Sequence, residues 1–370
     1  MRRSIYFNYA GVAPIPFDLF LKLLNFLFYY YYVGPPRVMI KYDKYIPLLY
    51  QEIANLLNCS PKEISYIKNT TEGVILAAES LPLKEGDEIL VMQCEYSANF
   101  IPWLKLKKQG IDVKLIGGES TEISYLNLIR SISPRTKAIA VSWVQFYDGY
   151  TSDIKSLSLL CKQKNIFLIV DAVQIAGTRT IDLSAVNIDI LMCGSHKHLM
   201  SIVGCGFIYV NQNTLPLLKE HKVGTRSVKF FNKNEYEIRN DSSRFEDGTP
   251  NLLGIFALYT RIRSINKIGV KAIEQKSLEL LDYYKSYLTE NDILFIDHAQ
   301  QGNLISLPVK NPLILKNELE KAGIYVRVIN DVIRISFSYL NKRSDIKKFV
   351  KVFKSNVEVP ETIPTSKAYA

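Results

Sequence analysis

Two neighbouring stretches decide the fold of this chain: NIFLIVDAVQIAG (165–177) and IDILMCGSHKHLMSIVGCGFIYV (188–210). Each begins with a run rich in Val, Ile and Leu, and each run leads into polar residues. Runs this continuous are typical of strands buried on both faces, as in a parallel sheet covered by helices. The polar residues that follow, Asp171 and Lys197 among them, are therefore expected at strand ends, where open α/β sheets bind ligands.

The same pattern extends from about residue 60 to residue 210. Short apolar runs alternate with segments of helical spacing, which predicts an α/β domain with a mostly parallel sheet. Helices are predicted at 71–81, after a Thr-Thr start, and at 153–164. The predicted strands are EILVM (88–92), DVKLI (112–116), AIAVSWV (138–144), IFLIVDA (166–172), IDILMCG (188–194) and CGFIYV (205–210).

After residue 250 the pattern changes to long helices followed by strands, which predicts a smaller α+β domain. We expect a large α/β domain over 15–250 and a small domain made of 1–14 with 251–370. The polar tail VPETIPTSKAYA (359–370) is predicted to be loose. The predicted elements of the small domain are helices 253–268 and 270–288, strands NLISLPV (303–309), YVRVI (325–329) and VIRISFS (332–338), and a helix from residue 344.

The segment 17–33 is the only stretch that could be mistaken for a membrane span, because it is rich in Leu, Phe and Tyr. It contains Asp18, Lys22 and Asn25, and a charge at mid-bilayer costs about 3 kcal/mol. We therefore interpret it as a helix buried in the fold or in a subunit interface, and expect no membrane partner.

Composition sets the class and the compartment. The chain has 370 residues, 48% apolar and 22% charged, which is typical of a globular protein with two domains. Its net charge of +10 is spread without a basic block, so no nucleic-acid partner is expected. The five cysteines form no CxxC pair, which argues against a zinc site or a disulfide framework. Without a signal peptide pattern at the start, a cytoplasmic location is predicted.

Three candidate site elements stand out, and each has a simpler structural interpretation. Asp171 ends an apolar strand, where a carboxylate is costly without a positive partner, although a helix N-cap or metal ligand would also fit. Lys197 lies between two strands and could form a Schiff base, but loop lysines are common. The segment Asn69–Gly73 (NTTEG) offers hydroxyls and backbone N–H groups to an anion, unless it is a plain N-cap.

A fourth candidate lies in the predicted small domain. Arg334 alternates with Ile333 and Ile335 on a predicted strand, so its guanidinium needs an anionic partner. That partner is either a bound carboxylate, held by the bidentate fork, or a carboxylate of the fold.

Together these segments resemble the class V aminotransferases, which are fold-type I pyridoxal-phosphate enzymes. The likeness is strongest to the branch with cysteine desulfurases, selenocysteine lyases, kynureninase and isopenicillin N epimerase-like proteins, and it covers nearly the whole chain. It implies a large domain with a mostly parallel seven-stranded sheet and a small α+β C-terminal domain. The matching segments are YFNYAGVAPIP (6–16), NTTEGV (69–74), EYSANFIPW (95–103), VSWVQFYDGYTSDI (141–154), VDAVQIAG (170–177), GSHKHLMSIVGCGFIYV (194–210), RFEDGTPN (244–251), GVKAIEQK (269–276) and VIRISFSYLNKRSDI (332–346).

The resemblance implies pyridoxal 5'-phosphate as the cofactor and indicates which residues would contact the cofactor ring. Lys197 would carry the cofactor as a Schiff base and later move the substrate Cα proton. Asp171 would pair with the pyridine nitrogen, and Gln174 would hydrogen-bond the phenolic oxygen. No metal is implied.

The resemblance also indicates which residues would bind the cofactor phosphate. Thr70 and Thr71 would bind it with their hydroxyls and backbone, helped by Ser195 and His196. Thr249 would reach the phosphate of a neighbouring subunit, which implies a homodimer with shared active sites.

The substrate side follows from the same resemblance. Arg334 matches the arginine that holds the α-carboxylate of a small amino-acid substrate, and Asn8, Ala10 and Gly11 would line this side of the pocket.

The chain departs from the desulfurase pattern in two places. Tyr96 and Ser97 replace two histidines, one of which stacks on the cofactor ring in desulfurases, so Tyr96 is a candidate for that role; Phe146 replaces an asparagine. Near the C-terminus, Arg327 and Arg334 are separated only by VINDVI, and no cysteine follows Cys205. The loop that carries the nucleophilic cysteine of desulfurases is therefore missing, which disfavours standard desulfurase chemistry.

These observations predict a pyridoxal-phosphate-dependent enzyme that removes the Cα proton of a small amino acid. Three outcomes stay open: C–S bond cleavage by β-elimination, transamination and epimerisation, of which a lyase or an aminotransferase is favoured. A desulfurase-like protein without the cysteine loop, or a cofactor-binding scaffold without catalysis, is the alternative.

Overall fold

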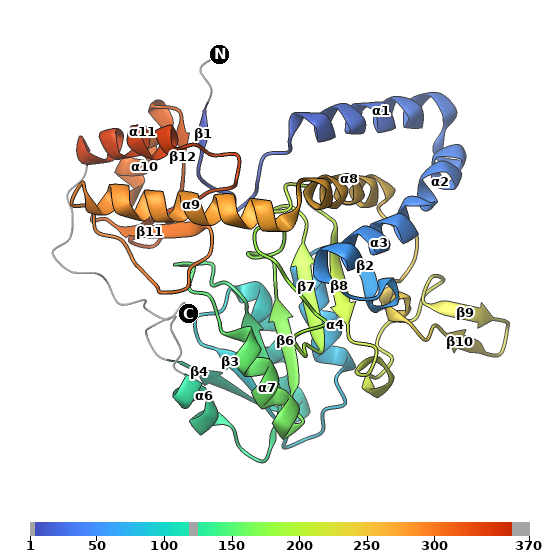
Figure 1. Cartoon of the computed structure of the whole chain (residues 1–370). Coiled ribbons are helices and arrows are strands. Elements are labelled where there is room, and N and C mark those ends of the chain that lie inside the picture. The colour runs from blue at the N-terminus through green and yellow to red at the C-terminus, as the bar shows by residue number, and fades with distance from the viewer. Residues whose placement is uncertain (1–3, 118–124, 357–370) are drawn as a thin grey trace.

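The centre of the protein is a seven-stranded sheet with helices on both faces (Figure 1). The computed structural model describes residues 4–117 and 125–356. The strand order is β2-β8-β7-β6-β5-β3-β4, in which β8 runs antiparallel to β2 and β7 and the other neighbours are parallel. The strands are β2 (Ile64–Ile67), β3 (Glu88–Met92), β4 (Asp112–Ile116), β5 (Thr136–Ser142), β6 (Phe167–Asp171), β7 (Ile190–Gly194) and β8 (Gly206–Val210).

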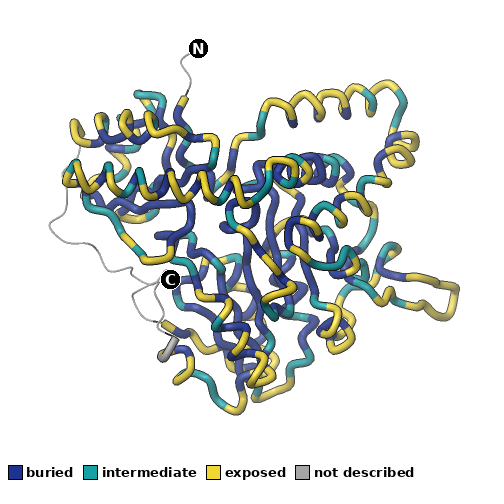
Figure 2. The backbone as a smooth tube through the Cα atoms, viewed as in Figure 1, coloured by how far each residue is buried: buried dark blue, intermediate teal, exposed yellow. Residues whose placement is uncertain are grey.

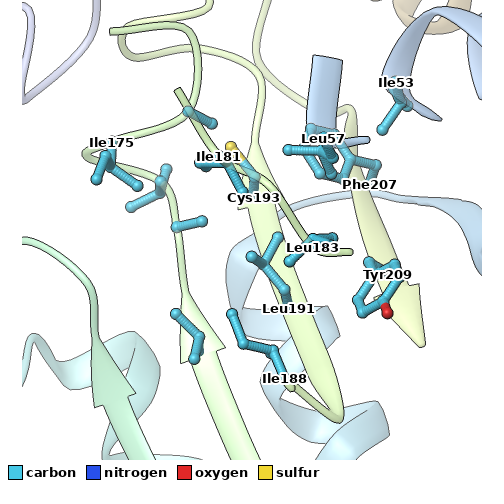
Figure 3. Close-up of a cluster of buried hydrophobic side chains, with 14 of the residues drawn as sticks. Ile53, Leu57, Ile175, Ile181, Leu183, Ile188, Leu191, Cys193, Phe207 and Tyr209 are labelled. Atoms are coloured by element: carbon cyan, nitrogen blue, oxygen red, sulfur yellow. The ribbon is translucent and has the colours of Figure 1, made fainter. Parts of the chain in front are cut away.

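Alternating side chains of this sheet enter two separate hydrophobic clusters, as the two-residue period of a strand requires. One face packs on α3 (Tyr45–Leu57), α7 (Ile154–Lys164) and α8 (Leu252–Ile268), and Figure 3 shows part of this cluster around Leu191 and Phe207. The other face packs on α4 (Thr70–Ser80) and α5 (Ile101–Leu104). The shorter α6 (Tyr125–Ser131) precedes β5. Strands β3, β6, β7 and β8 and nearly all of β5 are thus buried on both sides, which explains their apolar runs, whereas the edge strand β4 is half exposed.

A second unit lies beside this sheet and has its own hydrophobic cluster, to which Ile5 and Phe7 from the start of the chain contribute. Its sheet has the order β11-β14-β13, all antiparallel. Its elements are β1 (Ile5–Tyr6), α9 (Val270–Thr289), β11 (Leu304–Pro308), α10 (Pro312–Lys321), β12 (Ile324–Tyr325), β13 (Arg327–Ile329), β14 (Val332–Ser336) and α11 (Arg343–Lys354).

The predicted α/β class and six central strands are confirmed with shifts of one or two residues at their ends, and so are the predicted helices. The strand predicted over 325–329 is wrong as one element. It is divided at Val326 because β12 pairs with β1, whereas β13 pairs with β14. The division into 15–250 and 1–14 with 251–370 stays a prediction; α8 packs in the cluster of the large sheet. The tail 359–370 lies outside the described residues.

Helix α1 (Phe17–Val33) has the predicted bounds, but it is only partly buried in the fold, and its place in a subunit interface stays a prediction. Leu19, Leu23 and Phe26 face the protein, while the opposite side is exposed along most of the helix (Figure 2). Asp18, Lys22 and Asn25 are exposed on this helix. The exposed apolar side chains beside them follow helical spacing: Phe17, Phe20, Leu21, Leu24, Leu27, Phe28 and Tyr31. Within the described residues, no helix is long and apolar enough to cross a membrane.

Two peripheral elements complete the fold. Helix α2 (Pro35–Asp43) follows α1, and the hairpin of β9 (Val228–Phe231) and β10 (Tyr236–Ile238) projects away from the body (Figure 1).

Candidate active site

A cavity of about 650 Å³ lies where β6 and β7 end, between the large sheet and the β13–β14 hairpin. Parallel strands deliver their carboxyl ends to one edge, and this edge is where the sequence predicted a site. Ten of the thirteen predicted site residues line the cavity: Asn8, Ala10, Gly11, Thr70, Thr71, Tyr96, Asp171, His196, Lys197 and Arg334.

Lys197 and Asp171 form the charged centre of the cavity. Asp171 is the last residue of β6 and is 4% exposed, and Lys197 follows β7, the neighbouring parallel strand. Burial lowers the pKa of Lys197 to about 8, although the Asp171 carboxylate acts in the opposite direction. Burial likewise raises the pKa of Asp171 to about 6 against the effect of Lys197. The amine is therefore closer to its neutral, nucleophilic form than an ordinary lysine.

The start of α4 offers an anion site at the same edge. Asn69 caps the helix by accepting a hydrogen bond from the Glu72 N–H, and Thr70 and Thr71 open the first turn. The Gly194 N–H donates to the Thr70 hydroxyl oxygen (3.1 Å), which fixes the helix start against the end of β7. Free backbone N–H groups and the helix dipole favour an anion here.

His196 lies beside this anion site. Burial, and next the charge of Lys197, lowers the pKa of His196 to about 4. Its imidazole is therefore neutral near pH 7 and can donate one hydrogen bond.

An aromatic wall faces Lys197. The Tyr96 ring lies with its centroid 5.6 Å from the Lys197 Nζ atom and contacts the Phe146 ring edge-on at a centroid distance of 5.1 Å. The structure thus brings the predicted stacking residue to the cofactor side of the cavity.

Arg334 reaches the cavity from β14 and is 3% exposed. Its Nη1 donates to the Phe146 carbonyl oxygen (2.5 Å), and its Nη2 donates to Asn8 Oδ1 (3.4 Å). The next inward residue of β14, Ser336, accepts from the Ala10 N–H (2.9 Å) and so holds the N-terminal segment in place. These contacts aim a guanidinium at the cavity from the side opposite the large sheet.

Three predicted residues do not line the cavity. Ser195 is buried and donates its hydroxyl to the Ile202 carbonyl oxygen (2.5 Å). Gln174 is buried; its Nε2 donates to the Ala10 carbonyl oxygen (3.1 Å), and its Oε1 has no hydrogen-bond partner. Thr249 is exposed. Their predicted roles stay predictions.

Sequence reasoning missed the turn between β13 and β14 as part of the site. Arg327, Val328, Ile329 and Asn330 all line the cavity, and the Asn330 φ of 49° closes a tight turn. The signal was the six-residue spacing between the two arginines, which places them side by side on paired strands. Glu95 was also missed, because a glutamate after a strand carries no signal of its own.

A partly buried lysine near a buried carboxylate at strand ends, with a helix start for an anion and an arginine opposite, is the arrangement expected of an enzyme site for an anionic cofactor and a carboxylate substrate. The model of the family described as Aminotransferase class-V matches residues 5–349, so the chain belongs to this family. It is a pyridoxal-phosphate-dependent enzyme of the lyase or transferase type that acts on an amino acid.

Known relatives agree with this assignment. The chain is 28% identical over 329 residues to a probable cysteine desulfurase of Borreliella burgdorferi, which covers 80% of this chain and 78% of the relative. A probable cysteine desulfurase of Methanothermobacter thermautotrophicus is 24% identical over 287 residues, covering 76% of this chain and 72% of the relative.

Solved structures share the fold. The complex of the cystine C–S lyase C-DES with its product cysteine persulfide matches with a TM-score of 0.88 at 22% identity, covering 95% of this chain and 97% of the other. The apo cysteine desulfurase of Thermococcus onnurineus matches with a TM-score of 0.85 at 23% identity, covering 94% and 93%.

The residues present fit pyridoxal phosphate. A buried carboxylate at Asp171 requires a positive partner, which a protonated pyridine nitrogen would provide. The α4 start suits a phosphate, and Lys197 suits an aldehyde. The buried, unpartnered Gln174 Oε1 marks a polar position that a ligand or water would satisfy.

Proposed function

We propose that this enzyme cleaves the C–S bond of a small sulfur-containing amino acid by β-elimination and releases the sulfur product into solution. The observation that carries the proposal is the tight β13–β14 turn. It closes the cavity beside Arg334 without adding a cysteine.

Each group at the site has a proposed task. Lys197 would hold the cofactor, Asp171 would keep the ring nitrogen protonated, and Thr70 and Thr71 with the α4 start would hold the phosphate. His196 would add a donor to the phosphate, and Tyr96 would offer its ring as an aromatic face. When bound, the cofactor supplies an electron sink for negative charge at the substrate Cα.

Side chains of the protein carry out the binding of the substrate and the transfer of its proton. Arg334 holds the substrate α-carboxylate with its guanidinium fork and so aims the Cα–H bond at Lys197. The released Lys197 amine removes that proton as a general base, for which a pKa of about 8 is suited near neutral pH. The Cβ–S bond then breaks, and the sulfur leaves with the electron pair and takes up a proton. With water, cysteine yields pyruvate, ammonia and sulfide, whereas cystine yields pyruvate, ammonia and cysteine persulfide.

The cysteines of this chain do not provide an alternative sulfur acceptor. None of the five lines the cavity. Cys193, behind the site on β7, is fully buried, and burial raises the pKa of its thiol well above the usual value. Burial also raises the pKa of Cys94. A thiol held protonated is a poor nucleophile, so no enzyme-bound persulfide is expected.

Product analysis tests the proposal. Purified enzyme with pyridoxal phosphate is incubated with cysteine, cystine, alanine and serine, and pyruvate, sulfide and persulfide are measured. Mass spectrometry of the intact protein looks for added sulfur. Pyruvate and free sulfur product without protein-bound sulfur support elimination; alanine with protein-bound sulfur would contradict it. Keto acid formed only with an added acceptor indicates transamination, and racemised amino acid indicates an epimerase.

We also propose that the enzyme is a homodimer. The exposed apolar side chains of α1, from Phe17 to Tyr31, would lie at its interface and are called the α1 stripe. Exposed apolar side chains gathered on one helix are typical of interaction surfaces, and aromatic side chains are enriched in interfaces. Thr249, predicted to reach a partner's phosphate, does not line the cavity of its own chain, which supports a site completed by a second copy. A cytoplasmic location without nucleic-acid or membrane partners stays a prediction.

Light scattering tests the interface. Leu27→Gln with Phe28→Gln changes two α1 residues that are 51% and 60% exposed. Leu313→Gln with Ile314→Gln on α10 is the control, since these side chains are 66% and 61% exposed. We expect the α1 variant to dissociate at concentrations where wild type and control remain dimers; an equally stable dimer would exclude the stripe from the interface.

A further inference from the structure

Glu95 is a buried carboxylate at the cavity wall that the proposed chemistry does not use. It follows β3 by three residues, is 5% exposed and directly precedes Tyr96. Burying an ionised carboxylate in a protein costs several kcal/mol unless donors replace its water. A chain that needed only a filled space here would be served by an apolar side chain.

The carboxylate accepts four hydrogen bonds from three segments. The Ser142 N–H donates to its Oε1 (2.6 Å) and the Ser142 hydroxyl to its Oε2. The Asn99 side-chain amide donates to Oε2 (3.0 Å), and the Gln145 side-chain amide donates to Oε1 (3.1 Å). All four donors are neutral. Burial raises the pKa of Glu95 to about 7, and the four donors, which favour the charged form, oppose this effect.

Each of these segments carries part of the site. Residues 95–99 form the turn with Tyr96, whose ring faces Lys197. Ser142 ends β5, next to Asp171 on β6. Gln145 precedes Phe146, whose ring contacts Tyr96 and whose carbonyl oxygen accepts from Arg334. The Glu95 carboxylate thus links the Tyr96 turn to the end of β5 and, through the Phe146 segment, to Arg334.

We propose that Glu95 is a positioning residue that holds the Tyr96 turn and the Phe146 segment against β5, so that the Tyr96 ring and Arg334 keep their places around Lys197. The effect on catalysis passes through Tyr96 and Arg334, since the four hydrogen bonds of Glu95 described above go to Ser142, Asn99 and Gln145 and not to Lys197. The kinetic part of this inference rests on the proposed function, whereas the structural part does not.

The variant Glu95→Gln tests the positioning role. Glutamine keeps the shape of the side chain, but its NH₂ group replaces one oxygen of Glu95 and must then face groups that are themselves hydrogen-bond donors. Glu88→Gln is the matched control: Glu88 is also a buried glutamate on β3, but at the other end of the strand, where it accepts from the Ser133 and Thr136 hydroxyls. A rescue variant combines Glu95→Gln with Gln145→Glu, which moves the carboxylate across an existing hydrogen bond.

Hydrogen–deuterium exchange of the cofactor-free protein gives a readout that needs no activity. In Glu95→Gln we expect faster exchange at 95–100 and 142–147 and unchanged exchange at 190–194. In Glu88→Gln the 95–100 segment should exchange as in wild type. Equal exchange of 95–100 in wild type and Glu95→Gln would overturn the proposal, whether or not the enzyme eliminates sulfur.

Kinetics give the second readout. For Glu95→Gln we expect kcat/KM for elimination to fall about 10- to 100-fold, as for loss of charge-assisted hydrogen bonds. The affinity for pyridoxal phosphate should change less than about threefold, because the backbone and Lys197 contacts remain, and the rescue variant should regain at least part of the loss. An unchanged kcat/KM, or a fall of the same size in Glu88→Gln, would contradict a positioning role.

If Glu95→Gln does not fold, Ser142→Ala replaces it, since it removes one of four donors and leaves the backbone N–H. We then expect smaller increases in the exchange of 95–100 and 142–147 and a smaller fall in kcat/KM. If neither is found, the proposal is contradicted.

Discussion

The inner and outer walls of the cavity are built in different ways. The inner wall, with Asp171, Lys197 and the α4 start, is fixed by the backbone of adjacent strands: Asp171 pairs in register with Met192, and the Gly194 N–H binds Thr70. The outer wall, with Tyr96, Phe146 and Arg334, is held by side-chain hydrogen bonds between distant segments. In the outer wall, Tyr96 and Phe146 replace residues of the desulfurase pattern, whereas Arg334 matches it. We therefore expect the inner wall to set the cofactor chemistry and the outer wall to influence the outcome of the reaction.

The largest effect is expected for a change in the inner wall. Asp171→Asn removes the carboxylate opposite the ring nitrogen, and we expect kcat to fall by about 10²- to 10³-fold, the size found when a preorganised electrostatic partner is lost. Steady-state kinetics with saturating cofactor measure it. A fall below about threefold would show that the inner wall does not control the chemistry.

A change in the outer wall should act on substrate rather than cofactor. Arg334→Lys keeps the charge but loses the planar fork, so we expect kcat/KM to fall about 10- to 100-fold, mainly through KM, with cofactor affinity unchanged. Arg327→Lys, on the paired strand, is the control and should have the smaller effect. If Arg334→Lys lost the cofactor, this would contradict the expectation that the outer wall acts on the substrate and the inner wall on the cofactor.

The pH dependence of cofactor uptake sharpens the description of the inner wall. The neutral Lys197 amine is the reactive form, so the rate of reconstitution should rise with pH and level off above about 8, the lowered pKa, rather than near 10.5. Asp171 raises the Lys197 pKa, so Asp171→Asn should move the midpoint to lower pH. Stopped-flow absorbance measures both; a midpoint at the ordinary lysine value would contradict burial of the amine.

The smallest effect is expected at Tyr96. Tyr96→Phe keeps the ring and should change kcat/KM less than about threefold, whereas Tyr96→Ala removes the stacking face and should cost about tenfold. Kinetics and visible circular dichroism of the bound cofactor compare the two. Equal losses in both variants would assign the effect to the hydroxyl rather than to the ring.

The sequence predicted the inner wall better than the outer one for a physical reason. Strands such as IFLIVDA carry their own signal, and parallel pairing brings Asp171 and Lys197 to one edge. The Arg334 contact with Phe146 joins residues 188 positions apart, and the Glu95 contacts depend on how a turn packs, so neither has a local pattern. The sequence left open whether α1 packs in the fold or in a subunit interface, because periodicity and composition do not tell a helix in a core from one on a partner.

The most direct test of the central claim is to trap the cofactor on its lysine. Wild type and Lys197→Ala are incubated with pyridoxal phosphate, reduced with borohydride and digested, and the modified peptide is identified by mass spectrometry. The account predicts one stable adduct, on the peptide containing residue 197, and no comparable adduct in the variant. An adduct of equal yield in Lys197→Ala, or on another lysine of the wild type, would contradict it.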